Sequence, residues 1–592
     1  MVPLARPLHA QERPARTLRV AFGTAEAGFD PPRVGDQSSI RVISHIFEPL
    51  LTYDVLARPA VLVPRTAARL PEMSADFKRL VVTLRPGILF ADDPVFGGKP
   101  RELTAGDYVY SLKRFFDPAI RTEHLYQFEN LKLIGLSELR QAAIKAKTPF
   151  PYDTEVPGLR ALDRYRLELV MAQPQPRAAY ALAQWFSAAV AREVIEAPAY
   201  AADPMAHPVG TGPFRLGQWR RASRIVLERN PRFRSDVFST VATFGEGAEP
   251  HLKEAATQLA GQRSPLLDRV EIDIIEESQP RWLAFLAGDH DVLSVPTDYG
   301  GLAMPGGRVA PFLARQGVQA QRMKSPNVGH TFFNMDDPLV GGLSPEKVAL
   351  RRAVTLAYDN LAEIRIVFGG NAAPAASMIP PGCYGHDPAL VSEMISPSPS
   401  RAKALLELHG YVDRNGDGFR ETPDGKPLVL RMAFTPDQRS RVVSELWLKR
   451  MRAVGIRVSF EFAPFAELIR RALAGQIMMW GFNWSAGSPD GDFFLGLGYG
   501  PNSEQSNDAR FRLPAFDRLY ERQNKLPDGP ERLALMQQAV RTMLAYVPYL
   551  SHNHRIETEL FHAHVRGPFR HPFMGRWYEW LDVGPRAAVK AP

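Results

Sequence analysis

Hydrophobic and polar residues alternate along several short stretches of the chain, a pattern that predicts β-strands. In other stretches apolar residues recur every three or four positions, which predicts amphipathic helices. The expected strands are Thr17–Phe22, Leu80–Arg85, Arg164–Val170, Arg224–Arg229, Val270–Ile275 and Leu428–Phe434. The expected helices are Ile40–Leu51, one from Thr104 to Asp117-Pro118, Pro280–Ala287, Pro345–Phe368 and Ser400–His409. Strands and helices mixed along the whole chain, without a repeat of 20–50 residues, predict an α/β fold.

Three stretches depart from this pattern. Residues 137–160 and 235–267 are rich in polar or small residues, so we expect insertions or long loops there. The most apolar window is Ala178–Ala191, which is bracketed by Arg177 and Arg192. It is shorter than the about 20 residues that a membrane-spanning helix needs. We therefore expect a buried helix in this window.

Composition and charge bound the class of protein. The chain has 592 residues, of which 45% are hydrophobic and 23% charged, so it is too long for one hydrophobic core and too apolar to be disordered. The net charge of +8 is modest and does not by itself indicate nucleic acid. The basic run from Arg220 to Arg234 lies on an alternating strand, which is typical of a solvated face, with nucleic-acid binding as the alternative. Cys383 is the single cysteine, which excludes an intramolecular disulfide and a cysteine-based metal site.

The first 16 residues are polar and contain prolines, and we expect ordered structure to begin near residue 16. Leu8-His9-Ala10 is similar to the small-residue end of a secretory signal, but the apolar region of such a signal is missing. Residues 1–16 are therefore either the remnant of a leader or a disordered lead that resembles one by chance.

Motifs of enzymes are missing from the sequence. It contains no GxxxxGK[ST] phosphate loop, no GxSxG nucleophile elbow, no HExxH metal motif and no GxGxxG at the start of a helix. Carboxylates and histidines can still meet through space, so an enzyme remains an alternative without a motif to support it.

One loop has the spacing of a calcium ligand set. Asp413, Asn415, Asp417, Glu421 and Asp424 occupy positions 1, 3, 5, 9 and 12, with a glycine at position 6. An aspartate replaces the bidentate glutamate of position 12, which weakens the match. The same residues also build plain turns, so a structural turn is the alternative.

Five of the 14 histidines fall within 20 residues. They are His552, His554, His562, His564 and His571. On strands, residues two apart share a face, which is compatible with binding a transition metal. Hydrogen-bonded or surface histidines that flank a final strand are the alternative.

A series of short motifs runs from about residue 17 to residue 580. The strongest is Pro208-Val-Gly-Thr-Gly-Pro213-Phe214, followed by Trp219 and Asn230-Pro231. The others include Ile46–Leu50 (IFEPL), Leu84–Gly87 (LRPG), Arg281–Asp291 (RWLAFLAGDHD), Leu350–Asp359 (LRRAVTLAYD), Met451–Ile456 (MRAVGI) and Trp480–Phe494. In this order they resemble the family 5 extracellular solute-binding proteins of ABC transporters, the group that contains oligopeptide-, dipeptide- and nickel-binding proteins.

The resemblance implies a periplasmic-binding-protein-like fold of type II, with two α/β lobes linked by a hinge and an extra domain inserted in the first lobe. On this basis the first lobe comprises residues 17–57, 205–292 and 548–592, the inserted domain residues 58–204, and the second lobe residues 293–547. We expect the hinge crossings near Asp291–Pro296 and Tyr546–Ser551. Ligand would be enclosed when the lobes close.

The resemblance also suggests a ligand site in the segment Trp480–Phe494. Peptide-binding members hold the peptide's α-amino group with an aspartate, but the corresponding positions here are Asn483, Trp484 and Ser485. Without a carboxylate a buried ammonium is poorly compensated, so anchoring of a peptide N-terminus is in doubt. We expect stacking of the solute on aromatic rings, polar contacts beside them, and weaker contributions from two residues before a long helix. The candidate residues are Trp484, Trp480, Asn483, Ser485, Asp490, Asn334 and His330.

The expected function is therefore the substrate-binding component of an ABC importer, which captures a peptide or peptide-like solute and delivers it to the permease and its ATPase. We expect a periplasmic monomer that has no catalytic residue and no cofactor and binds no nucleic acid. Nickel, a metal chelate or haem is the alternative cargo, and a hydrolase is the alternative class.

Overall fold

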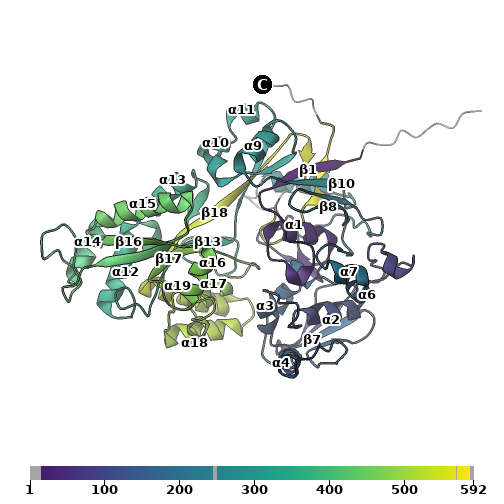
Figure 1. The fold of residues 1–592 in the computed structure, drawn as a ribbon, viewed down its shortest axis with the longest axis horizontal. Helices are drawn as coiled ribbons and strands as arrows, with labels where there is room; N and C mark the ends of the chain where they lie inside the picture. Colours follow the sequence, from purple (N-terminus) through teal and green to yellow (C-terminus); the bar gives the residue numbers. More distant parts are fainter. Residues whose placement is uncertain (1–14, 245–249, 568–569, 587–592) are drawn as a thin grey trace, which may run out of the picture.

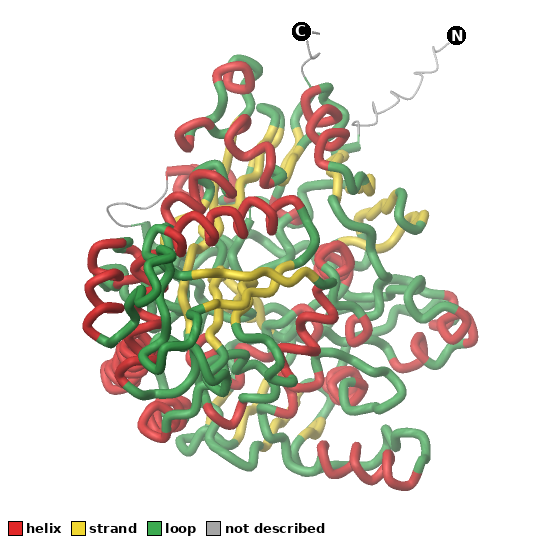
Figure 2. Tube along the Cα trace, turned by 60° about the vertical axis from the view of Figure 1, so that its left-hand side comes forward, coloured by secondary structure: helices red, strands yellow, loops and turns green. Residues whose placement is uncertain are grey.

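The computed structural model describes residues 15–244, 250–567 and 570–586 (Figure 1). The expected leader remnant or disordered lead covers residues 1–16, and residues 1–14 lie outside the described residues. Figure 1 shows one body built by the N-terminal third of the chain and a second by the middle of the chain. Figure 2 shows strands in the middle of the molecule with helices around them. Within the described residues, no helix is both long and apolar enough to cross a bilayer.

A 12-stranded sheet runs through both bodies, in the order β16-β15-β17-β13-β18-β11-β1-β10-β9-β8, with β12 and β14 also paired to β18. On the first side are β1 (Thr17–Phe22), β8 (Phe214–Arg220), β9 (Arg224–Arg229), β10 (Arg269–Ile274) and β11 (Val292–Ser294). The parallel pair β1–β10 brings Leu18 opposite Val270 and Val20 opposite Ile272, all buried. The sequence pattern therefore predicted β1, β9 and β10 correctly, because each contributes buried residues to one core, whereas β8 and β11 were not expected.

The second side of the sheet carries β13 (Asn327–Phe333), β15 (Val429–Phe434), β16 (Arg457–Phe462), β17 (Met479–Ser485) and β18 (Tyr549–Phe561). Helices cover its two faces. They are α12 (Pro345–Ala357), α13 (Asn360–Val367), α14 (Pro399–Leu408), α15 (Gln438–Arg452), α16 (Phe465–Leu473), α17 (Asp492–Gly496), α18 (Pro514–Asn524) and α19 (Pro530–Tyr546). One buried cluster, which includes Trp447 and Leu430, packs α12 to α15 on one face, and another, which includes Trp480 and Phe516, packs α16 to α19 on the other.

Residues 58–204 contain a separate four-stranded sheet in the order β4-β5-β7-β6. Its strands are β4 (Glu72–Met73), β5 (Arg79–Thr83), β6 (Leu159–Ala161) and β7 (Arg166–Val170). Its helices are α2 (Ala105–Arg114), α3 (Leu125–Glu129), α4 (Leu136–Ala146), α5 (Ala178–Ala181), α6 (Arg192–Ile195) and α7 (Pro198–Ala202). A capping box between Thr104 and Asp107 begins α2, as the sequence indicated. Val82 of β5, Leu112 of α2 and Leu167 of β7 belong to one buried core, which holds the sheet and its helices together.

The remaining elements are short. They are α1 (Gln37–Ile46), α8 (Pro250–Leu259), α9 (Ser278–Leu286), α10 (Gly300–Ala303), α11 (Pro311–Ala314), β2 (Leu51–Tyr53), β3 (Leu62–Pro64), β12 (Gln319–Lys324), β14 (Ala372–Pro374), β19 (Val565–Arg566) and β20 (Asp582–Val583). The helix expected over Ile40–Leu51 ends at Ile46, because Phe47 is already extended and leads into Pro49.

Three other expectations are corrected. The helix expected over Pro345–Phe368 is two helices, since Tyr358 is extended and the Asp359 side chain caps α13 by accepting from the amide of Ala362. The window Ala178–Ala191 holds only α5 and one short turn, because the backbone of the buried residues Ala188 and Ala191 is extended. The stretches 137–160 and 235–267 are not plain loops: they contain most of α4 and all of α8, each with buried apolar residues.

Two extended segments cross side by side between the bodies. β18 pairs with β13 through residues 549–553, with β12 through residues 556–561 and with β11 through residues 559–561. The crossing therefore lies at about residues 325–327 and 553–556, later than the expected Asp291–Pro296 and Tyr546–Ser551. A buried cluster of Trp282, Leu293, Leu313 and Leu560 also packs residues 293–320 on the first side.

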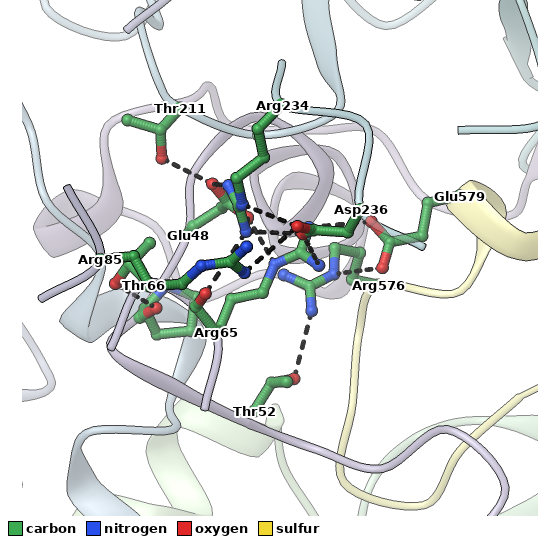
Figure 3. Close-up of polar contacts among 12 residues, drawn as sticks. Glu48, Thr52, Arg65, Thr66, Arg85, Thr211, Arg234, Asp236, Arg576 and Glu579 are labelled. Atoms are coloured by element: carbon green, nitrogen blue, oxygen red, sulfur yellow. Dashed lines mark hydrogen bonds and ion pairs between the residues drawn. The ribbon is translucent and has the colours of Figure 1, made fainter. Parts of the chain in front are cut away.

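A buried carboxylate, Glu48, joins distant segments on the first side (Figure 3). Arg234 binds it with two nitrogens at 2.8 and 3.0 Å, Arg65 pairs with it, and Thr211 donates to it at 2.9 Å. Burial would raise the pKa of Glu48, but the charges of Arg234 and Arg65 outweigh burial and hold the pKa below its ordinary value. Glu48 is therefore ionised throughout the physiological range.

The glycines on either side of Thr211 let the loop approach α1. A Cβ on Gly210 would lie 2.1 Å from the carbonyl oxygen of Ile46, and one on Gly212 2.5 Å from that of His45. The amide of Gly212 donates to the Ile46 carbonyl at 2.8 Å. Only glycine fits at this distance, so the loop that delivers Thr211 to Glu48 depends on both residues.

We predict that Glu48→Gln lowers the free energy of unfolding by about 3–5 kcal/mol, because Arg65 and Arg234 then stay buried without a full counterion. Urea unfolding at neutral pH measures this difference. Because the folded pKa is depressed, the contribution is present above pH 4.5, the ordinary glutamate pKa, and is lost as the pH falls below it. Glu72→Gln, in the exposed pair with Arg69, is the matched control and should leave the stability almost unchanged. Equal losses in the two variants would contradict this prediction.

Candidate ligand-binding site

A cleft of about 570 Å³ lies beside the crossing segments, with walls from both bodies. These walls come from α1, Gln184 and Trp185, residues 294–297, residues 325–327, Phe368 and Asn371, residues 485–487, residues 555–559, residues 570–575 and Trp577. A cavity of this size is suited to a small solute, and one that lies between two bodies can close around it.

Two carboxylates of β18, Glu557 and Glu559, line the cleft and pair with the same arginine. Arg570 lies 3.0 Å from Glu559 and also pairs with Glu557. Ser294 donates to Glu559 at 2.7 Å. Burial would raise the pKa of Glu557, but the positive charge of Arg570 lowers it. Both acidic side chains of the cleft therefore already have a cationic partner.

Two other arginines line the cleft, Arg41 of α1 and Arg555 of β18. Arg41 lies over the ring of Phe22, 5.5 Å from the ring centroid. Arg555 lies 6.0 Å from the centroid of Phe368, and within the described structure its buried Nε has no hydrogen-bond partner. No carboxylate oxygen of the described residues lies within 4.0 Å of a nitrogen of either guanidinium.

Burial lowers the pKa of both groups. It brings the pKa of Arg555 to about 10, with help from the charge of Arg439. Burial and the charge of Arg570 lower the pKa of Arg41. Since an arginine keeps its proton in proteins, the cleft holds two cations whose charge is only partly balanced.

Neutral polar side chains also line the cleft. His571 is buried, and burial lowers its pKa well below the ordinary value, so the ring is neutral. Its Nδ1 accepts from the amide of Phe573 at 3.1 Å, which leaves the proton on Nε2. Among residues 15–244, 250–567 and 570–586, His571 Nε2, Asn371 Nδ2 and Thr558 Oγ1 are buried without a hydrogen-bond partner. All three residues are among those that line the cleft.

Comparison with known proteins identifies the group to which this architecture belongs. A model of the bacterial extracellular solute-binding proteins, family 5, matches residues 61–506. The chain belongs to this family. Di/tripeptide-binding protein 2 of Pseudomonas aeruginosa is 25% identical over 573 residues, which is 95% of this chain and 94% of that protein. Heme-binding protein A of Haemophilus influenzae is 23% identical over 85% of this chain and 81% of that protein.

A solved structure supports the fold of this family member. A periplasmic murein tripeptide binding protein in its unliganded open form superimposes with a TM-score of 0.71, at 19% identity, over 96% of this chain and 98% of that chain. The two-lobe α/β fold expected from the motifs is therefore confirmed, and the family match confirms the role of a solute-binding protein.

The structure does not bring the candidate residues of this family member into one cavity. Ser485 lines the cleft between the lobes. Trp480, Asn483 and His330 line a second cavity of about 320 Å³ inside the second lobe. That cavity also contains His552, whose ring nitrogens lie 2.9 Å from Glu363 and 2.8 Å from Thr331.

Two of the tryptophans differ in exposure. Trp480 is 2% exposed and packs in the core against Phe465 and Phe482. Trp484 is half-buried and contacts the rings of Phe482 and Phe493. Its indole Nε1 donates to Asp508 at 3.3 Å.

Asp490, Asn334 and His330 are engaged inside the second lobe. Asp490 is 1% exposed and binds both terminal nitrogens of Arg532 at 2.7 Å. Asn334 donates to the carbonyls of Gly475 and Ile477. His330 is buried against Phe482 and Tyr549, and burial lowers its pKa to about 3, so its ring is neutral.

The loop suggested for calcium is held by bonds within the protein. Asp413 accepts from the amides of Gly416 and Gly418, Asn415 from that of Asp417, and Asp417 pairs with Arg457. Asp424 pairs with Lys426. In the part of the chain that the structure describes, no group of three or more His, Cys, Asp or Glu side chains is arranged for a metal ion.

The histidines of the C-terminal segment have separate partners. His554 contacts the carbonyl of Asn327, His562 that of Phe285, and His564 the carboxylate of Asp291. The ring of His571 stacks on Tyr53, 5.6 Å between centroids. Only His552 and His554 lie on β18, whereas His562, His564 and His571 follow the strand, so the five histidines do not form one site.

Sequence reasoning missed Arg41, Arg555 and Arg570. One signal was available. Residues 551–559 form a run of mostly polar side chains between apolar flanks, and such a run is unusual for a strand in the middle of a large sheet.

Two sets of contacts join the inserted segment to the second lobe. Arg177 of the inserted segment donates to the carbonyls of Leu526 and Asn524 at 3.0 and 2.9 Å and lies 3.5 Å from Asp492. Gln184 donates to the carbonyl of Gly487 at 2.7 Å. The lobes thus touch directly as well as through the crossing strands.

We predict that the indole of Trp484 reports the ionisation of Asp508. Burial raises the pKa of Asp508 to about 7, so its carboxyl group gains charge near neutral pH. Tryptophan fluorescence should change with a midpoint near pH 7, and Asp508→Asn should remove this transition. Because the folded pKa is raised, the stabilising contribution of the protonated carboxyl is fully present below about pH 4 and is lost as the pH rises through 7. Glu504→Gln, at an exposed carboxylate, is the control; a transition that persists in Asp508→Asn would contradict the assignment.

Proposed function

We propose that the protein captures a peptide or peptide-like solute between its lobes and delivers it to the permease and ATPase of an ABC importer. The observation that carries this proposal is the cleft of about 570 Å³, lined by both lobes and by the strand that joins them. The names of the relatives support the class of solute, since several are di/tripeptide- or oligopeptide-binding proteins. Relatives described as periplasmic support action in the periplasm, where we propose that the protein works as a monomer.

Lobe closure follows from the paired crossing segments. Residues 319–333 and 549–561 run antiparallel over their length, so bending both near residues 325–327 and 553–556 changes the angle between the lobes. We therefore propose lobe boundaries near residue 325 and residue 555, with residues 58–204 as the inserted domain. A solute that contacts both lobes favours the closed form by the free energy of those contacts.

The resemblance places the aspartate that holds a peptide's amino group at one of three positions, and of these Ser485 lines the cleft. A serine cannot neutralise an ammonium group. Among the lining residues the acidic side chains are Glu557 and Glu559, both paired with Arg570. We therefore propose that recognition does not depend on a free peptide N-terminus. The histidines of the C-terminal segment do not support a metal or haem cargo, because each ring contacts a different part of the protein.

The test is ligand binding by the purified full chain. We expect a defined mixture of di- and tripeptides to raise the thermal unfolding midpoint, and mass spectrometry to detect a small solute in the protein as purified. At a ligand concentration 100 times Kd the stabilisation is about 2.7 kcal/mol. A midpoint that peptides leave unchanged but nickel or haem raises would overturn the class of solute, and turnover of the peptides would overturn the carrier function.

We predict that Arg177→Met weakens solute binding by about 3- to 10-fold, because it removes contacts between the lobes that favour the closed form. Isothermal calorimetry measures the affinity, and small-angle scattering should show a larger radius of gyration. Arg192→Met, which removes exposed ion pairs within the inserted segment alone, is the matched control. An unchanged affinity in Arg177→Met would show that these contacts do not bias closure.

A further inference from the structure

The second cavity, of about 320 Å³, has two glycines in its floor. Gly329 of β13 pairs with Asn483 of β17 on one side and with Asn553 of β18 on the other. Gly481 of β17 pairs with Thr331, which lies two positions after Gly329 on β13. Residues two apart on a strand share a face, so two neighbouring positions on one face of the sheet have no side chain. This leaves space over the sheet for part of a ligand.

A Cβ at either glycine would enter this space. At Gly329 it would lie 3.3 Å from both the nitrogen and the oxygen of the Asn553 side-chain amide. At Gly481 it would lie 2.8 Å from Thr331 Oγ1. The Asn553 amide therefore stands at the edge of the space over Gly329.

The orientation of the Asn553 amide is fixed by Glu363 of α13, which lines the same cavity. Burial would raise the pKa of Glu363, but its interaction with His552, 2.9 Å away, holds the pKa below its ordinary value. An ionised carboxylate only accepts, so the nitrogen of Asn553 faces it and donates at 3.1 Å. The side-chain oxygen of Asn553 is buried and has no hydrogen-bond partner among the described residues. It is an unused acceptor.

The cavity is also lined by an unused donor. Trp447 of α15 is fully buried, and its indole Nε1, which can only donate, has no partner within the described part of the chain. The Trp447 ring lies 4.4 Å from that of Tyr358 and 6.3 Å from that of His552, centroid to centroid. The Tyr358 hydroxyl donates to Glu363 at 2.7 Å. The unused donor and the unused acceptor therefore stand around the same buried carboxylate.

The charges of the described lining residues balance. Apart from His552, they are two carboxylates and two guanidiniums, those of Glu363, Asp437, Arg439 and Arg555. Asp437 already accepts from the amide and the hydroxyl of Ser440. A carboxylate in this cavity would leave the Asn553 oxygen unpaired because it has no donor, and an ammonium would leave the Trp447 N–H unpaired because it has no acceptor. The pair of unused groups thus fits an uncharged ligand that both donates and accepts.

We propose that this cavity is a specificity subsite for an uncharged polar group of the solute, a carboxamide or a hydroxyl, which accepts from Trp447 Nε1 and donates to Asn553 Oδ1. This inference rests on the proposed capture of a solute and specifies one group of that solute. Arg555 lines both this cavity and the cleft between the lobes, so the two spaces adjoin. Aromatic rings suit the carbon atoms that carry such a group, and the cavity is lined by those of Phe434, Phe465 and Phe482.

The test compares side chains of similar shape on one peptide. The probes are trialanine and alanine tripeptides in which one position carries glutamine, glutamate, methionine or lysine, with homoserine as the hydroxyl form, at each position in turn. We expect calorimetry on the full chain to find one position at which glutamine or homoserine binds roughly 10-fold more tightly than methionine, which leaves both buried groups unpaired. Glutamate and lysine should bind more weakly still, because each also loses the hydration of its charge. The tighter of the two favoured side chains identifies the group as a carboxamide or a hydroxyl.

Variants place the effect in this cavity. Trp447→Phe keeps an aromatic ring but removes the donor, and Gly329→Ala places a methyl group 3.3 Å from the Asn553 amide. Each should lower the preference over methionine by about 3- to 10-fold and leave the affinity for trialanine almost unchanged. Trp282→Phe, at a buried tryptophan of α9 outside both cavities, is the matched control and should bind like the wild type. Circular dichroism checks the fold of each variant, and the preference of the wild type is measured without them.

The outcomes separate this inference from the proposed function. If trialanine binds but neither glutamine nor homoserine is preferred at any position, the subsite is overturned while solute capture stands. A preference that survives unchanged in both Trp447→Phe and Gly329→Ala would place the polar group elsewhere and also overturn the assignment. Absence of binding by every peptide would contradict the proposed function and, with it, this inference.

Discussion

The arrangement of the first lobe depends on the ion pairs of one buried carboxylate. Glu48 contacts Arg65 and Arg234, and Arg65 also reaches Glu579 at 2.9 Å, which in turn binds Arg576 at 3.1 Å (Figure 3). These residues come from the beginning, the middle and the end of the described chain. Desolvation of so many charges is costly, and it is tolerated because each guanidinium finds an acceptor when all segments are in place. The network thus favours one relative position of the segments over others.

The relative position of these segments determines which residues line the cleft. The C-terminal residues that carry Glu579 and Arg576 continue from the part that contributes Arg570 and His571 to the cleft wall. The same segment is also tied to α1, because the ring of Tyr578 stacks on His45 at 4.4 Å and its amide donates to that ring. Arg41 lies one turn earlier on α1, and its carbonyl contacts His45 Nδ1 at 2.6 Å. Arg41 and Arg570 are therefore positioned by the same set of contacts, although the chain separates them widely.

The sequence predicted local structure at several elements that bury one face. The strand Thr17–Phe22 and the cap of α2 at Thr104 follow from patterns a few residues long, and the family motifs add the two-lobe fold. The break between α12 and α13 could not be predicted in the same way, because both halves keep a helical pattern and the stop depends on the Asp359 cap. The candidate ligand site was even harder to predict from the sequence. Trp480 and Ser485 lie on one strand, but which part of it meets the cleft depends on the partners of that strand, which are far away in sequence.

The crossing strand shows why polar residues are retained in the middle of a large sheet. β18 is buried along most of its 13 residues, and the exception is the run Arg555, Ile556 and Glu557, which is half-buried. This run lies where the strand leaves the second lobe and enters the first, so one side of it faces the cleft rather than a core. An apolar strand would make this crossing stable but would leave the cleft without charge. Arg555 and Glu557 instead bring charge to the point where we propose that the lobes bend relative to each other, so in the proposed closure a ligand bound there would act on the hinge.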